Sequence, residues 1–375
     1  MKTNIGVIFG GRTGEHDISV RSANTVIQNI DTERYEIVPV AISKDGAWLN
    51  PFESAALLSD DARSVLSNDF SEFESSQIAL TGDTQPKGFV DLKSSAISKL
   101  DVVFPILHGT YGEDGTIQGL LEMADIPYIG GGVLASSCGM DKVVMKTLFK
   151  EAGLPICKHV WFLRRDWENS SERVIQLVEN SIGYPCFVKP ANLGSSVGVS
   201  RAEDAEALKS SIALAAEYDR KIIVEEALNM REIECAVIGN DEPEASLPGE
   251  YLIRDKTKTF LDYTEKYSGT GNNEFVVPAP VSEELSKKIR QMAITAFQAI
   301  DGSGLARVDF FLRNDTGTLL VSEINTMPGL TDASGFPKMW AGSGMSFSAV
   351  IDRLVELALE RHKDKARNKT SLSDK

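Results

Sequence analysis

The sequence lacks any apolar run approaching the roughly 20 residues that a helix needs to cross a bilayer. We therefore expect no membrane-spanning segment. The N-terminus also lacks the apolar stretch and small-residue cleavage site of a secretory signal, because its first four residues lead directly into an alternating, strand-like run. These two absences predict a cytoplasmic protein.

Cysteine is scarce in the chain. Its four cysteines are widely spaced, and each has apolar or small neighbours: Cys138, Cys157, Cys186 and Cys235. Disulfide frameworks and zinc sites need cysteines at close, regular spacings. The pattern instead favours reduced thiols in the core.

Positive charge is in deficit, because 39 lysines and arginines stand against 54 aspartates and glutamates, for a net charge of −15. Nucleic acids are bound by clustered lysine and arginine, so a nucleic-acid partner is disfavoured. The G-x-x-x-x-G-K-[ST] phosphate loop is absent, and the N-terminal Gly10-Gly11 turn carries no G-x-G-x-x-G. An oxidoreductase with a dinucleotide fold is therefore disfavoured as well.

The length of 375 residues predicts two or three packed domains of α/β class. The N-terminal part reads as a βαβ unit, with strands at 5–9 and 35–42, a helix over 19–30 and a buried parallel-type strand at 101–107. A Ser- and Asp-rich stretch over 54–98 carries no predicted element, and the polar tail from His362 is expected to fray. We place the domains at residues 1–130, 131–224 and 225–375.

Two strands, 304–312 and 319–325, are separated by a polar turn and predict a hairpin. Because side chains alternate faces along a strand, Arg307 and Asp309 share one face of the first strand. Glu323 and Asn325 share one face of the second. Two carboxylates and an amide form a hard oxygen site of the kind that holds Mg²⁺ with substrate phosphates. The alternative is a solvated hairpin face with an incidental ion pair.

A second group of residues predicts phosphate binding without a phosphate loop. Lys189 ends a predicted strand and is followed by a small, glycine-containing loop up to Gly198. Backbone N–H groups of such a loop, together with a lysine, can hold phosphates. Lys142, just before a helix predicted over 141–152, adds a second positive charge. Each lysine alone is more often a surface residue.

Two glycine-rich turns follow predicted strands in the N-terminal part, at 10–17 and 108–115. Glycine lets a substrate approach the backbone closely, and an acid such as Glu15 can hold a substrate ammonium. The alternative is that Thr13, Glu15 or Asp17 simply caps the following helix.

Taken together and in this order, these segments resemble the D-alanine:D-alanine ligases of the ATP-grasp superfamily. The resemblance implies three α/β domains with a Rossmann-like parallel sheet first, ATP between the second and third, and a homodimer. It covers nearly the whole chain and rests on the segments at 9–11, 15–19, 108–119, 140–142, 189–198, 231–234, 262–267, 307–309 and 323–329.

The resemblance also implies a role for individual residues. ATP phosphates would contact Lys142 and Lys189, and the nucleotide would further be held by Glu225, Glu232 and Ser196. Two Mg²⁺ or Mn²⁺ ions would be bound by Asp309, Glu323 and Asn325. The substrates would meet Glu15, which holds the ammonium of the first D-alanine, along with Ser195, Tyr267, His108, Lys266 and Ser334.

In the implied reaction, the γ-phosphate of ATP moves to the carboxylate of the first D-alanine, and the amine of the second attacks the acyl phosphate. Arg307 and the N–H of Gly329 would stabilise the oxyanion. Tyr267 would favour an amide product. Gly335 departs from the bulky residue usual after Ser334, which keeps D-serine open as the second substrate. A non-catalytic nucleotide-binding protein on this fold is a further alternative.

Overall fold

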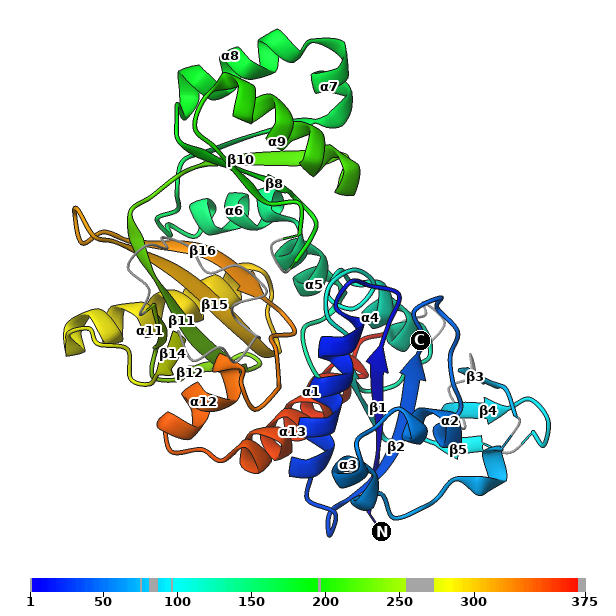
Figure 1. Ribbon diagram of the computed structural model, residues 1–375. Coiled ribbons are helices and arrows are strands. Elements are labelled where there is room, and N and C mark those ends of the chain that lie inside the picture. Colours follow the sequence, from blue (N-terminus) through cyan, green and yellow to red (C-terminus); the bar gives the residue numbers. More distant parts are fainter. Residues whose placement is uncertain are drawn as a thin grey trace.

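The computed structural model describes residues 2–74, 76–80, 87–95, 97–194, 197–253 and 273–369. Its elements are arranged around several sheets with helices packed on them, so the predicted α/β class is confirmed (Figure 1). No helix in the described part of the chain combines the length and apolar character that a membrane crossing requires.

The N-terminal sheet is parallel, with strand order β2-β1-β6. Strand β1 spans Thr3–Gly10, and helix α1 (His16–Asn29) leads to β2 (Tyr35–Ile42). Strand β6 (Val102–Ile106) pairs with the other side of β1. Because the strands run in the same direction, the glycine-rich turns after β1 and β6 meet at one edge, as predicted.

The stretch over 54–98 is more structured than its composition predicts. It contains α2 (Pro51–Ala56), α3 (Asp60–Ser64), the short 3-10 helix η1 (Ser71–Phe73) and an antiparallel sheet of β3 (Ile78–Leu80), β4 (Gly88–Asp91) and β5 (Ile97–Lys99). Strands of three or four residues are too short for a clear alternation of apolar and polar side chains.

The central sheet has the antiparallel order β7-β10-β8-β9, formed by His159–Leu163, Lys221–Glu226, Cys186–Pro190 and Ser200–Ala202. Helices α8 (Ser171–Ser181) and α9 (Ala205–Tyr218) share a buried apolar core with it, and α7 (Arg164–Asn169) follows β7.

The C-terminal sheet has six strands, in the order β14-β13-β11-β15-β16 with β12 beside β11. The strands are β11 (Met230–Gly239), β12 (Glu244–Ala245), β13 (Gly249–Ile253), β14 (Asn273–Val276), β15 (Gly304–Arg313) and β16 (Leu319–Asn325). Helices α5 (Val133–Met140), α6 (Lys142–Glu151) and α11 (Glu283–Ala299) bury their apolar faces with this sheet.

The last helix of the chain packs against the N-terminal elements. Helices α12 (Gly335–Gly342) and α13 (Phe347–Lys365) belong to the same apolar core as β1, β6 and α1, and α13 lies beside α1 in Figure 1. The expectation that the chain frays from His362 onward is wrong for residues 362–365, which belong to α13. His362 Nε2 lies 2.9 Å from Asp125 Oδ1, and Lys365 pairs with Glu122 at the end of α4 (Thr116–Met123).

The four cysteines carry free thiols, and three of them are buried, as their spacing predicted. The division of the chain at residues 130 and 224 stays a prediction.

Candidate active site

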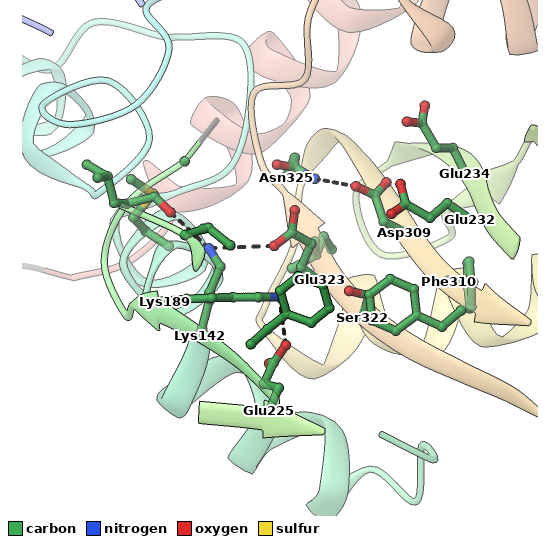
Figure 2. A pocket seen from close by; sticks show the side chains of 18 of the residues that line it. Lys142, Lys189, Glu225, Glu232, Glu234, Asp309, Phe310, Ser322, Glu323 and Asn325 are labelled. Atoms are coloured by element: carbon green, nitrogen blue, oxygen red, sulfur yellow. Dashed lines mark hydrogen bonds and ion pairs between the residues drawn. The ribbon is translucent and has the colours of Figure 1, made fainter. Parts of the chain in front are cut away.

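The predicted hairpin is confirmed, and it brings four polar side chains together. Strands β15 and β16 are antiparallel, with Arg307 opposite Asn325 and Asp309 opposite Glu323. Along β15 buried residues alternate with half-buried ones, so Arg307 and Asp309 face the same side. Figure 2 shows Asp309, Glu323 and Asn325 directed into one pocket.

Asp309 is the centre of this group. It accepts hydrogen bonds from Nε and Nη2 of Arg307, each at 2.7 Å, and from Nδ2 of Asn325 at 3.1 Å. Burial raises the pKa of Asp309 to about 6, although Arg307 opposes the shift. Glu234, directly opposite Asp309 on β11, places Oε2 3.5 Å from Arg307 Nε. Arg307 therefore lies between two carboxylates.

The two predicted phosphate lysines approach the hairpin from the central sheet and from α6. Lys142 donates to Leu193 O at 2.9 Å and lies 3.5 Å from Glu323 Oε2. It is placed by Asp141, whose carboxylate caps α6 by accepting from two backbone N–H groups. Lys189, at the end of β8, donates to Oε2 of Glu225 on β10 at 2.7 Å.

These groups line one pocket between the central and C-terminal sheets. Its polar lining residues include both lysines, Glu225, Glu232, Asp309, Glu323 and Asn325. The hairpin and lysine patterns predicted five of these seven, and the family resemblance implied Glu225 and Glu232. Its apolar lining residues include Met140, Phe187, Leu228, Met230 and Ile324. A pocket lined by both charged and apolar side chains suits a ligand that carries an aromatic base and phosphates.

Glu15 lies at the edge of the N-terminal sheet, next to two glycines. A Cβ at Gly109 would lie 2.5 Å from Glu15 Oε2, and one at Gly194 would lie 3.3 Å from it. Both glycines therefore allow the carboxylate a close approach. Glu15 precedes α1, but its side chain makes no capping hydrogen bond. The capping alternative is thus wrong for this residue.

His108 is buried and held at both ring nitrogens. Nε2 lies 3.0 Å from Ser22 Oγ, and Nδ1 lies 3.1 Å from Met327 O. Burial lowers the pKa of His108, which favours the neutral ring. The imidazole therefore connects the N-terminal sheet to the loop between β16 and α12.

Glu113 is a site residue that the sequence reasoning missed. Its carboxylate accepts from Gly109 N at 2.7 Å and from Met327 N at 3.3 Å, and it lines the same pocket. Burial raises the pKa of Glu113 to about 8, and the nearby charge of Glu15 adds to the shift. The available signal was an acid inside the glycine-rich 108–115 segment.

The loop between β16 and α12 carries Gly329 and Ser334. Met327 contacts His108 and Glu113, and Leu330 N donates to Ser22 Oγ at 3.4 Å, so Gly329 lies between two anchored positions. Ser334 is buried, and its Oγ lies 2.7 Å from Thr331 Oγ1.

Gly335, the residue after Ser334, is packed closely by its neighbours. A Cβ there would lie 2.5 Å from Glu234 Oε2 and 2.8 Å from the Phe275 ring. No larger side chain fits without rearrangement, which gives the departure from the family pattern a physical reason. Four predicted site residues, Ser195, Ser196, Lys266 and Tyr267, lie outside the described residues.

Comparisons with known proteins agree over nearly the whole chain. The family model of the D-ala D-ala ligase N-terminus matches residues 4–131, and that of the C-terminus matches residues 148–356. The D-alanine–D-alanine ligase of Bacillus licheniformis is 47% identical over 367 residues, covering 97% of this chain and 98% of the relative.

Solved structures give the same result. The D-alanine-D-alanine ligase from Coxiella burnetii matches with a TM-score of 0.80 and 33% identity, over 98% of each chain. The VanG D-Ala:D-Ser ligase from Enterococcus faecalis matches with a TM-score of 0.81 and 35% identity, over 96% of this chain and 100% of that one. With its two family models, its relatives and its ATP-grasp fold in agreement, the chain belongs to the D-alanine–D-alanine ligase family.

Proposed function

We propose that this protein uses ATP to join two D-alanine molecules into D-alanyl-D-alanine for peptidoglycan synthesis, releasing ADP and phosphate. The observation that carries the proposal is the single pocket in which two lysines, two carboxylates and an amide converge, in a chain of this family. The reaction passes through a D-alanyl phosphate, an acyl phosphate that water would destroy.

ATP is the nucleotide of the proposed reaction. Lys142 and Lys189 bind its phosphates, because both side chains line the pocket. Glu225, Glu232 and Ser196 hold the rest of the nucleotide. The apolar lining residues supply the surface against which the base packs.

Two Mg²⁺ or Mn²⁺ ions are the proposed metal cofactors. The donor set of Asp309, Glu323 and Asn325 fits them, since carboxylate and amide oxygens are the ligands that such ions prefer. When bound, the ions supply neutralisation of phosphate charge. Arg307 holds Asp309 with two hydrogen bonds and thereby fixes the orientation of its carboxylate.

Each substrate has its own set of residues in this proposal. Glu15 binds the ammonium of the first D-alanine, with Ser195 and Tyr267 near it. Ser334 binds the carboxylate of the second D-alanine, and His108 and Lys266 are further substrate-binding residues. Arg307 and the N–H of Gly329 stabilise the oxyanion formed when the second amine attacks the acyl phosphate.

The test is phosphate release from Mg-ATP by the purified protein, with mass spectrometry of the product. The proposal expects release that depends on D-alanine and a D-alanyl-D-alanine product. Nucleotide binding without D-alanine-dependent release would favour the non-catalytic alternative.

D-serine as the second substrate is a separate candidate, favoured by Gly335 and by the similarity to a D-Ala:D-Ser ligase. Adding D-serine to the same assay separates the two candidates. A higher kcat/KM for D-serine than for D-alanine would overturn the first.

We further propose that the protein is cytoplasmic and that its domains lie at residues 1–130, 131–224 and 225–375.

We also propose that it is a homodimer. Helices α4 and α5 contact each other and expose four apolar side chains that a second copy would cover: Leu120, Met123, Val133 and Leu134. Light scattering after gel filtration gives the mass, and that of a single chain would contradict the dimer.

A further inference from the structure

Lys146 is a buried lysine that the proposed mechanism does not use. It lies one helical turn after Lys142 on α6, and only 1% of its side chain is exposed. Burying an ammonium group costs free energy unless other groups compensate its charge and hydrogen bonds. The neighbours of Lys146 therefore indicate why the sequence places a lysine here.

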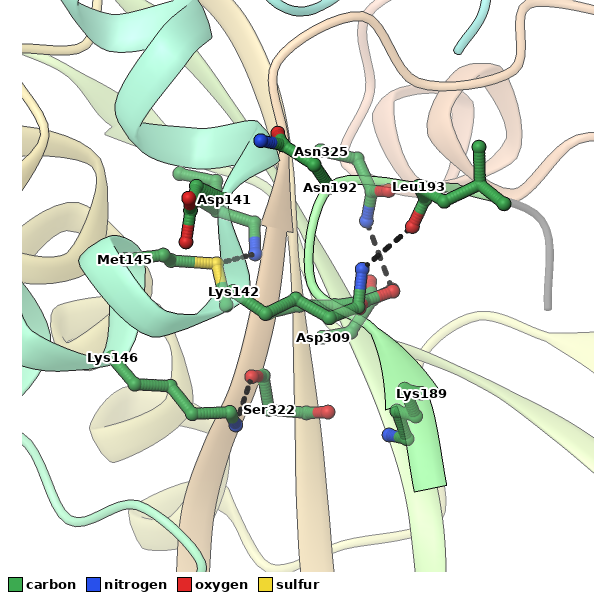
Figure 3. A network of polar contacts seen from close by, with 12 residues as sticks. Asp141, Lys142, Met145, Lys146, Lys189, Asn192, Leu193, Asp309, Ser322 and Asn325 are labelled. Atoms are coloured by element: carbon green, nitrogen blue, oxygen red, sulfur yellow. Dashed lines mark hydrogen bonds and ion pairs between the residues drawn. The ribbon is translucent and has the colours of Figure 1, made fainter. Parts of the chain in front are cut away.

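The ammonium group of Lys146 is enclosed by groups of the protein itself. Lys146 Nζ donates hydrogen bonds to Ser322 O at 2.9 Å and to Cys157 Sγ at 3.6 Å, and it forms an ion pair with Glu225 Oε1 at 2.9 Å. Figure 3 shows Lys146 directed at Ser322, with Lys142 above it and Lys189 on the far side of Ser322. Any effect of Lys146 on a ligand must therefore act through these partners.

Glu225 is held between two ammonium groups. Lys146 lies at its Oε1 from the buried side, and Lys189 donates to its Oε2 from the pocket side. Burial alone would raise the pKa of Glu225, but the two lysines hold it well below its usual range. The group formed by Lys146, Glu225 and Lys189 therefore carries a net charge of +1.

Lys146 also joins the two sheets that form the pocket. Glu225 belongs to β10 of the central sheet, and Ser322 belongs to β16 of the C-terminal sheet, next to Glu323. The buried side chain of Lys146 on α6 thus contacts both of these sheets. Its removal would free Glu225 to move and would leave Lys189 neutralised by Glu225 alone.

From this geometry we propose that Lys146 is a positioning residue of the nucleotide site. It neutralises Glu225 from behind, which fixes that carboxylate and leaves Lys189 with charge for an anionic phosphate. The inference rests on the proposed function only in taking the pocket as the ATP site.

The experiment is titration calorimetry of wild type and of Lys146→Met with ATP at fixed Mg²⁺. Methionine keeps most of the side-chain volume and removes the charge. We expect ATP to bind about tenfold more weakly or worse, because one partner of a buried charge group is lost. The KM for ATP should rise in parallel, while the KM for D-alanine stays within about twofold.

Lys150→Met is the matched control, since Lys150 lies on the same helix one turn later and is exposed. It should bind ATP like wild type. A lysine with a purely structural role would lower the melting temperature in Lys146→Met without changing ATP affinity. Wild-type affinity in Lys146→Met would therefore overturn the proposal.

A double-mutant cycle tests the route through Glu225. In a Glu225→Gln background, Lys146→Met should weaken ATP binding no further, because its partner charge is already gone. An equal loss in both backgrounds would overturn the proposal. If Lys146→Met alone does not fold, the ATP affinities of Glu225→Gln and of the double variant can still be compared. Neither of these two proteins contains the ionised carboxylate that Lys146 neutralises.

The two proposals can fail separately. If wild type binds ATP but releases no phosphate with D-alanine, the proposed ligase reaction is wrong and the Lys146 inference is still decided by the affinities. If phosphate is released but Lys146→Met binds ATP normally, only the inference is wrong.

Discussion

The raised pKa of Glu113 predicts that this residue makes the protein less stable as the pH rises. Unfolded Glu113 loses its proton near the ordinary value of 4.5, whereas the folded residue keeps it up to about 8. Between these values the folded state binds the extra proton. The stabilisation is complete below pH 4.5, declines as the pH rises and is lost by about pH 8.

The magnitude follows from the same two values. Each pH unit in this window costs about 1.4 kcal/mol in free energy of unfolding. Between pH 6 and the folded pKa of about 8 there are about two pH units. Ionisation of Glu113 should therefore lower the free energy of unfolding by roughly 3 kcal/mol between pH 6 and pH 9. The cause is a carboxylate that must ionise beside Glu15 and away from water.

The assay is urea unfolding of wild type and Glu113→Gln at pH 6 and at pH 9. All other titrating groups are shared, so the difference between the two proteins isolates Glu113. Wild type should lose roughly 3 kcal/mol more than the variant over this interval. Parallel losses in both proteins would refute the reasoning, because Glu113 would then ionise without cost.

Three further predictions concern other parts of the chain. Glu323→Gln should lower turnover about a hundredfold or more with an unchanged melting temperature, because it removes a charge from the proposed metal site; full activity would contradict that assignment. Gly335→Leu should cost about 1–3 kcal/mol in urea unfolding, since its Cβ would meet Glu234 Oε2 at 2.5 Å; an unchanged midpoint would count against the packing described. Arg361→Met should cost about 2–4 kcal/mol, because a partly buried guanidinium and its hydrogen bonds to Tyr128 O and Ser303 Oγ are lost. Arg353→Met on the same helix is its control, because the Arg353 side chain is 41% exposed; equal effects would exclude a special role for Arg361.

The sequence predicted the hairpin site well because its signal is local. Strict alternation in two adjacent strands places Arg307, Asp309, Glu323 and Asn325 on one face whatever surrounds them. The glycine-containing loop after Lys189 and the position of Lys142 before a helix indicated both lysines, and their convergence with the hairpin is what the fold shows.

Other features depended on distant parts of the chain and left no local pattern. The carboxylate of Glu113 accepts a hydrogen bond from Met327 N, and Lys146 contacts Glu225 and Ser322. Likewise, the last turn of α13 is polar and looks free until Glu122 and Asp125 are placed beside it, more than 200 positions earlier in the sequence. Such contacts arise from tertiary packing, which periodicity does not report.

The shared core between α13 and the N-terminal sheet has a consequence for synthesis on the ribosome. Strand β6 ends at Ile106, and its packing partner α13 begins only at Phe347, roughly 240 residues later. At about 5–20 residues per second, the nascent N-terminal segment would wait roughly 10 to 50 seconds with an apolar face uncovered. During this interval the uncovered apolar face is open to aggregation, and the N-terminal fold should be complete only once α13 has been synthesised.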